Sequence, residues 1–427
     1  MVGPFLFGED SRYLGLMRIT LMRHGETDLN ASNVWQGHSI GELSDLGKDQ
    51  VRKAVDRIDP SAYDVVVASD LTRAVQSAEL LGLPFEVDRR WREIDVGDWS
   101  GRRYAEIVAS EPEVMAAVMR GEDVVIGGGE SFTQLSERVL DAFTRLAARI
   151  GDDGSALVVT HGGTILSLVA DHWNISRGFD APVIAPTNTS FTTFEHDYGS
   201  WKLNRYNDGS HLGLLHGQAA DYARGGSSIL TFVRHGETEA NVRQVWQGKG
   251  DWGLNDQGRL QASALAAVFS PTGPIYASPS GRAAQTAATL DGHGVTHVDG
   301  LMEIAMGRWE GLEVDAVKTG WADHFERTFV GGEDLKRGET GENVAELMLR
   351  LRNTVDEIMA NHPSEHVAFV SHGSAIRSFV VSVLGGANRE FRNTGIVPNT
   401  GLSHVVLTDG RYRLADYGVA PHLEALR

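Results

Sequence analysis

The chain of 427 residues contains no cysteine. This absence excludes a disulfide framework, thiolate catalysis and cysteine-based zinc sites. Long hydrophobic runs are missing too, since no segment approaches the roughly 18 apolar residues needed to cross a bilayer. The apolar start within residues 1–16 is interrupted by Gly8, Glu9 and Asp10, and it lacks the basic region of a secretory signal. We therefore expect a cytoplasmic protein without a membrane partner.

Positive charge is scarce relative to negative charge. The sequence has 39 Lys and Arg against 57 Asp and Glu, which gives a formal net charge of -18. This balance argues against nucleic acid or an anionic membrane as the main partner. It is compatible with a small anionic substrate, because exposed charges are screened beyond about 8–10 Å and a few cations in one pocket act locally.

One motif occurs twice without change. Arg23-His24-Gly25-Glu26-Thr27 recurs as Arg234-His235-Gly236-Glu237-Thr238. Further residues recur in the same order and at nearly the same spacing: Asn30, Trp35, Arg73, Glu93, Trp99, His161, Asn188 and His211 are matched by Asn241, Trp246, Arg282, Glu303, Trp309, His372, Asn399 and His422. The chain therefore contains two copies of one domain. Its length suits two cores of about 200 residues each.

The repeat sets the domain boundaries. We place an N-terminal extension at 1–16, the first domain at 17–215, a linker at 216–227 and the second domain at 228–427. The linker is placed by Gly225-Gly226-Ser227-Ser228. Glycine and serine before a fresh strand are typical of a flexible connection.

Both domains alternate apolar runs with amphipathic segments. Short runs of β-forming residues predict buried strands at 19–22, 65–68, 156–159, 229–233, 275–277 and 367–370. Apolar residues at three- and four-residue spacing predict helices at 44–58, 71–81 and 131–150. We therefore expect two tandem three-layer α/β/α domains, each with a mainly parallel sheet and helices on both faces.

Polar residues follow the predicted strands of the first domain. His24, Ser69 and His161 each come directly after one. The carboxyl ends of parallel strands meet at one edge of the sheet, where ligands bind. These residues should converge on one crevice, and the second domain should repeat the arrangement.

Each domain resembles the histidine phosphatase superfamily. The matched pieces of the first domain are 23–27 with Asn30, 69–74, 92–94 with Gly97 and Trp99, and 160–162; those of the second are 234–238 with Asn241, 278–283, 302–304 with Gly307 and Trp309, and 371–373. The acid-phosphatase branch has an arginine where this chain has Thr27 and an aspartate where it has Gly162. The resemblance is therefore to the branch that includes phosphoglycerate mutase and small-molecule phosphatases.

The resemblance implies a role for each repeated polar residue. His24 and His235 would be nucleophiles that carry the phosphoryl group as phosphohistidine. Phosphate oxygens would be held by a set of cations and amides in each copy, which are Arg23, Asn30, Arg73 and His161 in the first and Arg234, Asn241, Arg282 and His372 in the second. Nearby cations also disfavour a proton on the attacking imidazole. No metal-ligand spacing is present, and the resemblance implies no cofactor.

Glu93 and Glu303 would donate a proton to the leaving alcohol. Like-charge repulsion from a bound phosphate dianion favours the protonated carboxyl. The same residue could then deprotonate the attacking water.

Some of the repeated residues have simpler interpretations. Trp35 and Trp246 fit packing better than ligand stacking. Asn188 and Asn399 are either turn formers or site residues. Ser69, like Ser278, needs no catalytic role.

The copies diverge between these motifs. Residues 38–42 correspond to 249–253, and Tyr104 corresponds to Val314. The segment 111–129 contains methionines, whereas 320–341 carries aromatic and basic residues, namely Trp321, His324, Phe325, Arg327, Lys336 and Arg337. The two pockets should therefore take different phosphate esters, unless one copy is catalytically idle.

The sequence thus predicts a metal-independent phosphomonoesterase with two complete active sites for small phosphorylated metabolites. A mutase, which returns the phosphoryl group to another hydroxyl, is an alternative, although these compact domains lack the longer basic insertion of the family's mutases. A phospho-ligand binding or scaffold role for one half is a second alternative, disfavoured because both residue sets are complete. The oligomeric state is not predicted.

Overall fold

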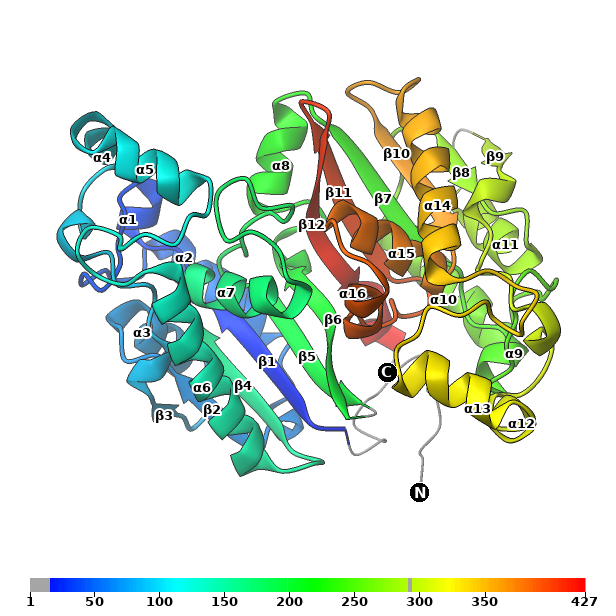
Figure 1. The fold of residues 1–427 in the computed structure, drawn as a ribbon. Coiled ribbons are helices and arrows are strands. Elements are labelled where there is room, and N and C mark those ends of the chain that lie inside the picture. Colours follow the sequence, from blue (N-terminus) through cyan, green and yellow to red (C-terminus); the bar gives the residue numbers. More distant parts are fainter. Residues whose placement is uncertain (1–15, 198, 291–293, 427) are drawn as a thin grey trace. The chain divides into compact units, whose positions relative to one another are not determined.

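A computed structural model describes residues 16–197, 199–290 and 294–426 (Figure 1). The contacts within the chain divide it into two compact units, Ser11–Gln218 and Ala219–Arg427. The expected N-terminal extension lies outside the described residues except for Leu16. Each unit is an α/β domain and is described by itself.

The first unit contains six strands in the order β3-β2-β4-β1-β5-β6. The first four in that order are parallel, and β5 and β6 follow as an antiparallel pair on β1. The strands are β1 Arg18–Arg23, β2 Val65–Ala68, β3 Glu86–Val87, β4 Ser155–Thr160, β5 Phe191–Asp197 and β6 Ser200–Asp208. The sheet is therefore mixed, whereas the sequence predicted only its parallel part.

The second unit repeats this topology in the order β9-β8-β10-β7-β11-β12. Its parallel part and its antiparallel pair correspond strand for strand to those of the first unit. The strands are β7 Ser228–Arg234, β8 Ile275–Ala277, β9 Val295–His297, β10 His366–Ser371, β11 Leu402–Thr408 and β12 Arg411–Val419.

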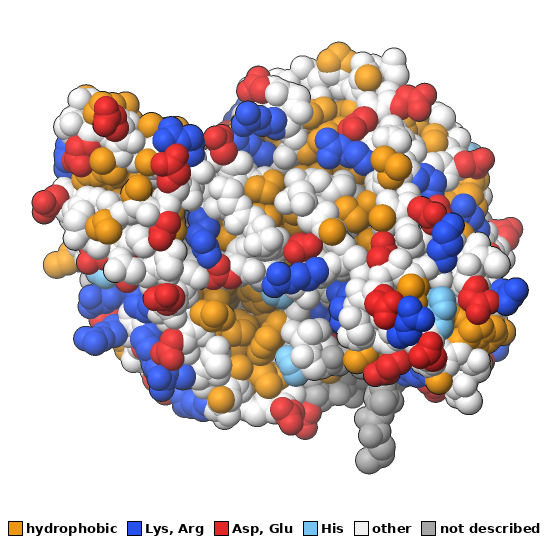
Figure 2. Space-filling model, in the orientation of Figure 1, with side chains coloured by type: hydrophobic (Ala, Val, Ile, Leu, Met, Phe, Trp, Pro, Cys, Tyr) orange, Lys and Arg blue, Asp and Glu red, His pale blue; other side chains and the backbone are white. Residues whose placement is uncertain are grey.

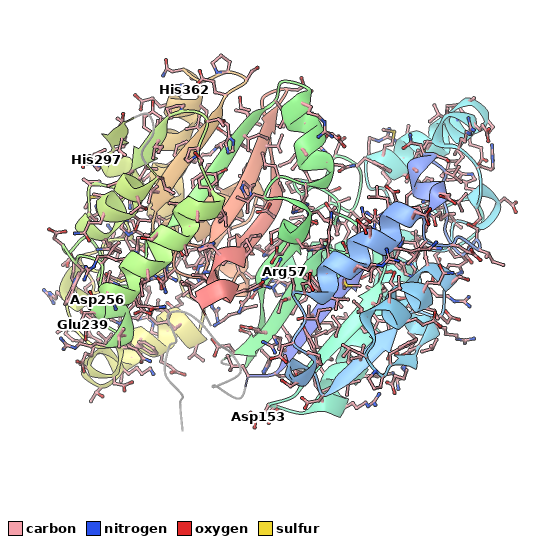
Figure 3. All side chains as sticks on the ribbon, turned by 180° about the vertical axis from the view of Figure 1, so that it is seen from behind. Arg57, Asp153, Glu239, Asp256, His297 and His362 are labelled. Carbon is pink, nitrogen blue, oxygen red and sulfur yellow. The ribbon has the colours of Figure 1, made fainter. Side chains whose placement is uncertain are left out.

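Helices cover both faces of each sheet. In the first unit α6 and α7 lie on the face seen in Figure 1, and α2 lies on the face seen in Figure 3. The helices of this unit are α1 Asp28–Ala31, α2 Asp45–Val55, α3 Thr72–Leu81, α4 Tyr104–Ser110, α5 Pro112–Met119, α6 Phe132–Ile150 and α7 Gly162–Trp173. Two starts are fixed by side-chain caps, since Ser44 accepts a hydrogen bond from Gly47 N and Ser131 accepts one from Gln134 N.

The second unit has matching helices and, in addition, the π-helical turn and helix α16. They are α9 Glu239–Val242, α10 Asp256–Val268, α11 Gly281–Thr289, α12 Val314–Gly320, α13 Ala322–Phe325, a π-helical turn Glu326–Val330, α14 Val344–Met359, α15 Gly373–Val383 and α16 Asn388–Asn393. Asp256 and Glu239, labelled in Figure 3, begin α10 and α9. None of the described helices is long and apolar enough to span a membrane.

Helix α8, Gly217–Arg224, occupies most of the predicted linker. Its sequence Gly-Gln-Ala-Ala-Asp-Tyr-Ala-Arg contains good helix formers, and Ala219 is buried. The glycine and serine signal therefore marks only residues 225–227, which follow the helix and precede β7. On the outer surface, Figure 2 shows acidic and basic side chains interspersed over the face drawn.

Candidate active sites

Parallel pairing brings the two histidines of each copy together. Arg23 at the end of β1 is in register with Thr160 at the end of β4, so His24 and His161 both follow directly. Their ring centroids lie 5.1 Å apart, and those of His235 and His372 lie 5.2 Å apart. The expected convergence at the carboxyl ends of the strands is thus present in both copies.

The glycine after the first histidine is required by close backbone packing. A Cβ atom on Gly25 would lie 2.6 Å from the carbonyl oxygen of Gly47, and one on Gly47 would lie 2.0 Å from the carbonyl oxygen of Glu26. Gly236 and Gly258 make the same approach in the second copy, at 2.6 Å. These recurrent glycines therefore allow the close backbone packing that positions the histidine.

The imidazole of His24 is held as one neutral tautomer. Its Nδ1 lies 2.7 Å from the carbonyl oxygen of Gly25, which can only accept, so Nδ1 carries the hydrogen and Nε2 keeps the lone pair, which accepts from Arg73 Nε at 3.2 Å. Burial, followed by the charges of Arg73 and Arg23, lowers the pKa of His24 well below its usual value. Nε2 is therefore the nitrogen of this imidazole that could attack a phosphoryl group.

His235 repeats this geometry. Its Nδ1 lies 2.7 Å from the carbonyl oxygen of Gly236, and the side chain is only 3% exposed. Burial, and then the charges of Arg282 and Arg234, lower its pKa well below the usual value. The two copies thus present the same tautomer.

Backbone carbonyls fix the arginines beside the histidines. Arg73 donates to Gly37 O at 2.8 Å and to Ser39 O at 3.2 Å, and its Nε donates to His24 Nε2 at 3.2 Å. Burial lowers the pKa of Arg73 to about 10, so the side chain is still a cation at neutral pH. Arg23 donates to Pro186 O at 2.6 Å. A phosphate would meet two cations that are already in place.

The arginines of the second copy are held in the same way. Arg282 donates to Gly248 O and Gly250 O, both at 2.8 Å, and Arg234 donates to Val397 O at 2.6 Å. One contact differs, because Arg282 Nε donates to Nδ1 of His372 at 3.2 Å rather than to the first histidine. The described residues contain no group of three or more His, Asp or Glu side chains placed to hold a metal ion.

A serine orients each second histidine. His161 Nε2 lies 2.8 Å from Ser69 Oγ, and His372 Nε2 lies 2.8 Å from Ser278 Oγ. Burial lowers the pKa of both imidazoles well below the usual value. We expected no role for these serines, and the structure shows them as positioning groups. The signal available in the sequence was their recurrence after the second predicted strand.

The glutamates lie at the first turn of the helix that follows the second histidine. Glu93 accepts from Gly163 N at 3.0 Å and from Ile94 N at 2.9 Å. Glu303 accepts from Ser374 N and Ala375 N, both at 3.1 Å. The positive end of the helix dipole holds each carboxylate near the histidines.

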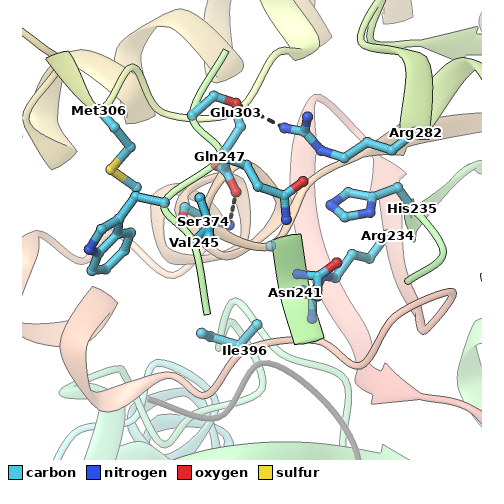
Figure 4. A pocket seen from close by; sticks show the side chains of 13 residues that line it. Arg234, His235, Asn241, Val245, Gln247, Arg282, Glu303, Met306, Ser374 and Ile396 are labelled. Carbon is cyan, nitrogen blue, oxygen red and sulfur yellow. Dashed lines mark hydrogen bonds between the residues drawn. The ribbon is translucent and has the colours of Figure 1, made fainter. Parts of the chain in front are cut away.

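Five of the six predicted residues of the second copy line one pocket, namely Arg234, His235, Asn241, Arg282 and Glu303 (Figure 4). In this view the imidazole of His235 lies between Arg282 and Arg234, and Glu303 and Ser374 line the same pocket. The remaining wall is formed by Val245, Trp246, Gln247, Gly248, Met306, Gly373 and Ile396. His372, the sixth predicted residue, is fully buried beside His235 and is not among the residues that line the pocket.

The asparagines near the start of each copy also cap a helix. Asn30 Oδ1 accepts from Thr27 N at 3.2 Å, and Asn241 Oδ1 accepts from Thr238 N at 3.1 Å. Because the oxygen is engaged, the amide nitrogen is the group available to a phosphate. Trp246 lines the pocket and also packs on Phe329, with ring centroids 5.6 Å apart.

A chain of hydrogen bonds supports the first histidine of each copy. Asn188 lies in a turn, and its Nδ2 also donates to the carbonyl oxygen of His24 at 2.9 Å. The next residue, Thr189, has a left-handed φ of 62°, and its hydroxyl lies 2.8 Å from His211 Nε2. Left-handed backbone at a threonine costs about 1–3 kcal/mol and persists only where the surroundings enforce it.

The second copy has the same chain. Asn399 donates to His235 O at 2.9 Å, Thr400 has a φ of 56°, and its hydroxyl lies 2.8 Å from His422 Nε2. The sequence contained the recurrence of these residues but gave no indication of their contacts.

Several known proteins are similar to this chain. A glucosyl-3-phosphoglycerate phosphatase of Mycolicibacterium vanbaalenii is 33% identical over 178 residues, which are 38% of this chain and 79% of that protein. Phosphoglycerate mutase-like protein 4 of Arabidopsis thaliana is 35% identical over 215 residues, 48% of this chain and 90% of that protein. A solved mycobacterial glucosyl-3-phosphoglycerate phosphatase with inorganic phosphate is 29% identical, covering 45% of this chain and 98% of that one, with a TM-score of 0.41.

A family model, described as histidine phosphatase superfamily (branch 1), matches this chain twice. The matches cover residues 19–209 and 230–420, and each includes one set of the residues described above. The chain therefore belongs to the histidine phosphatase superfamily, branch 1, as two tandem copies.

Proposed function

We propose that both copies hydrolyse small phosphorylated metabolites through a phosphohistidine intermediate. The observation that carries this proposal is the duplicated neutral imidazole. His24 and His235 are both buried, both have Nδ1 bonded to a backbone carbonyl, and both lie beside two fixed arginines. The relatives named as phosphatases act on small phosphorylated compounds, which supports the same substrate class here.

Phosphoryl transfer to the histidine would be the first step. The lone pair of Nε2 forms a bond to phosphorus while the bond from phosphorus to the ester oxygen breaks. Arg23 and Arg73 hold the phosphate oxygens as charge spreads over them, with charge-assisted hydrogen bonds of about 1.5–3 kcal/mol each. Protonated Glu93 gives its proton to the departing alkoxide, which leaves as the alcohol.

Hydrolysis of the phosphohistidine would complete the cycle. Glu93, now a carboxylate, takes a proton from a water molecule whose oxygen attacks phosphorus. The bond between phosphorus and Nε2 breaks, inorganic phosphate leaves, and the imidazole and the protonated glutamate are restored. Glu303 and His235 would perform the same steps in the second copy.

Four variants test the proposal. A panel of phosphate monoesters would be assayed with the full chain, His24→Ala, His235→Ala and the double variant, with His297→Ala as a control because His297 is exposed in β9. We expect each single variant to keep the substrates of the other copy and the double variant to lose all activity. Full activity in the double variant would refute the phosphohistidine route. If one single variant kept full activity on every ester of the panel, the copy that carries its substitution would be idle.

A further inference from the structure

The glutamate of each site lies on a segment that is neither helix nor strand. Glu93 falls between the 3₁₀ turns Arg89–Trp91 and Gly97–Trp99, and Glu303 has the corresponding place in the second copy. Because no helical or sheet ladder fixes this backbone, the position of the carboxyl depends on contacts from other elements. A catalytic group must be held within about 0.5 Å of its productive position, so these contacts bear on the chemistry.

Arg138, in α6, binds the backbone of this segment in the first copy. Its Nη1 donates to Arg90 O at 2.8 Å and to Arg92 O at 3.0 Å, and its Nη2 donates to Glu93 O at 3.2 Å. The rest of the guanidinium pairs with Glu130, through Nε to Oε1 at 2.8 Å and Nη2 to Oε2 at 2.7 Å. An arginine side chain has five N–H groups in a fixed plane, so these five bonds use all of them.

Glu130 holds the segment on the other side of the glutamate. Its Oε2 accepts from Asp95 N at 2.9 Å, and its own backbone N–H donates to Asp95 O at 2.7 Å. The carbonyls bound by Arg138 precede or belong to Glu93, whereas the contacts of Glu130 follow it by two residues. The pair therefore fixes the backbone path on both sides of Glu93.

The second copy repeats the pair. Arg350 donates to three carbonyl oxygens at 2.9, 3.0 and 3.3 Å, which are those of Gly300, Met302 and Glu303. It also donates to Glu342, through Nε to Oε1 and through Nη2 to Oε2, both at 2.8 Å. Glu342 Oε2 accepts from Ala305 N at 2.8 Å. The bonds have nearly the same lengths as in the first copy.

The side chains along the segment do not recur between the copies. Where the first copy has Arg90, Arg92 and Asp95, the second has Gly300, Met302 and Ala305. The pair thus recognises the backbone of the segment and not its side chains. Burial of Trp91, Ile94 and Val96 already anchors the segment in the core of the first copy. What the pair adds to this packing is a fixed position for the backbone beside the glutamate.

We propose that the arginine and glutamate of each pair are positioning residues for proton transfer, Arg138 with Glu130 in the first copy and Arg350 with Glu342 in the second. The inference rests on the function proposed above, in which the site glutamate gives its proton to the ester oxygen as the bond from that oxygen to phosphorus breaks. The carboxyl must come within about 2.6–3.2 Å of the leaving oxygen. A misplacement of about 1 Å can lower a rate by about 10²-fold.

The dependence on the leaving group tests this inference in the His235→Ala background, where only the first copy is active. The nitrophenolate of p-nitrophenyl phosphate is a weak base that departs without a proton, whereas the alkoxide of an alkyl ester such as glycerol phosphate needs one. We expect Arg138→Met to lower kcat/KM for the alkyl ester by about 10²-fold and for p-nitrophenyl phosphate by only a few-fold. The ratio kcat/KM covers phosphoryl transfer to His24 and excludes the later hydrolysis of the phosphohistidine.

Glu93→Gln provides the reference for this measurement. It removes the carboxyl and should show the same selective loss for the alkyl ester, to a larger extent. Adding Arg138→Met to Glu93→Gln should lower kcat/KM no further, because no carboxyl remains to be positioned. A loss of folded protein would instead add to the effect of Glu93→Gln and would affect both esters equally.

Further variants separate the planar guanidinium from its charge. Arg138→Lys keeps the charge but cannot span three carbonyls and a carboxylate, so it should behave like Arg138→Met. Glu130→Gln keeps an oxygen for Asp95 N and should cause a smaller loss with the same dependence on the leaving group, and it carries the test if Arg138→Met does not fold. Arg145→Met is the matched control, since Arg145 is exposed in the same helix and donates to Asp141 at 2.8 Å. Thermal unfolding checks that each variant is folded.

The outcomes separate this inference from the proposed function. Equal losses for both esters in Arg138→Met, or an additional loss in its combination with Glu93→Gln, would overturn the inference while the phosphatase proposal stands. If His235→Ala hydrolyses no ester, the same comparison is made with Arg350→Met in the His24→Ala background. Absence of hydrolysis in both backgrounds would overturn the proposed function itself.

Discussion

The candidate sites of the two copies share their chemical groups and differ in the residues around them. In the first copy Tyr104 stacks on Trp35 with ring centroids 5.1 Å apart and an interplanar angle of 11°, and Phe179 packs edge-on against both. The counterpart of Tyr104 is Val314, which is fully buried in the second copy. The second copy carries Arg337 and Arg377 where the first has Ile126 and Leu166.

The comparison shows which parts of the site the fold holds constant. Histidine tautomers, arginine anchors and the chain behind the nucleophile recur with nearly equal distances. The variable residues come from the segments after the glutamate and from the helix after the second histidine. Substrate choice can therefore change between copies without moving the reacting atoms.

The largest expected effect tests whether the chemistry is truly shared. Arg73 Nε contacts the first histidine of its pair, whereas Arg282 Nε contacts the second. If both arginines bind the transferring phosphoryl group, Arg73→Met and Arg282→Met should each lower kcat/KM by about 10²–10³. The measurement is steady-state kinetics in the His235→Ala and His24→Ala backgrounds, respectively.

Unequal losses of kcat/KM in Arg73→Met and Arg282→Met would show that the two copies do not share this part of the chemistry. If Arg282→Met left kcat/KM within a few-fold of the parent, the different contact of Arg282 would mean a different role in the second copy. Arg52→Met, a substitution of an exposed arginine in α2, is the control for a nonspecific effect of lost charge.

A smaller effect concerns the stability of the supporting chains. Burial, followed by the charge of Arg57, lowers the pKa of His211 to about 4, and burial lowers the pKa of His422 to about 4. Arg57, labelled in Figure 3, is paired with Asp208 in the first copy. Between pH 4 and pH 6.5 both histidines are neutral in the folded protein but bind a proton in the unfolded chain. Their contribution to the free energy of unfolding is therefore complete above pH 6.5 and is lost as the pH falls from 6.5 towards 4.

Each histidine should contribute up to about 3 kcal/mol over this window. We expect His211→Gln and His422→Gln to flatten the pH dependence of the free energy of unfolding, measured by chemical denaturation between pH 4 and pH 7. His297→Gln, at an exposed position, should leave the dependence unchanged. An unaltered slope in both chain variants would show that these histidines are protonated in the folded state.

The sequence predicted the strands that carry the chemistry because their side chains are buried on both faces. Val65–Ala68 and Ser155–Thr160 read as nearly continuous apolar runs bounded by polar residues. The antiparallel strands Phe191–Asp197 and Ser200–Asp208 were missed because they mix polar and apolar residues. Glu86–Val87 is short and exposed, and so has no hydrophobic signal.

The repeat identified the candidate residues but not their contacts. Ser69 bonds to a histidine that is 92 residues away in the chain, and the bond depends on the parallel pairing of β2 with β4.

The smallest expected effect tests the aromatic wall of the first copy. Tyr104 stacks on Trp35, whose counterpart Trp246 lines the pocket of the second copy, so the ring stands at the equivalent place in the first copy. Burial, and then the charge of Glu93, raises the pKa of Tyr104 to about 12. An aromatic contact with a substrate contributes about 0.5–1.5 kcal/mol. In the His235→Ala background, Tyr104→Val should therefore lower kcat/KM for phenyl phosphate by roughly 2- to 12-fold and leave glycerol phosphate unchanged. Tyr104→Phe keeps the ring and should behave like the parent. Equal losses for both esters would mean that Tyr104 supports the shared chemistry, and the contrast between the two walls would then not explain substrate choice.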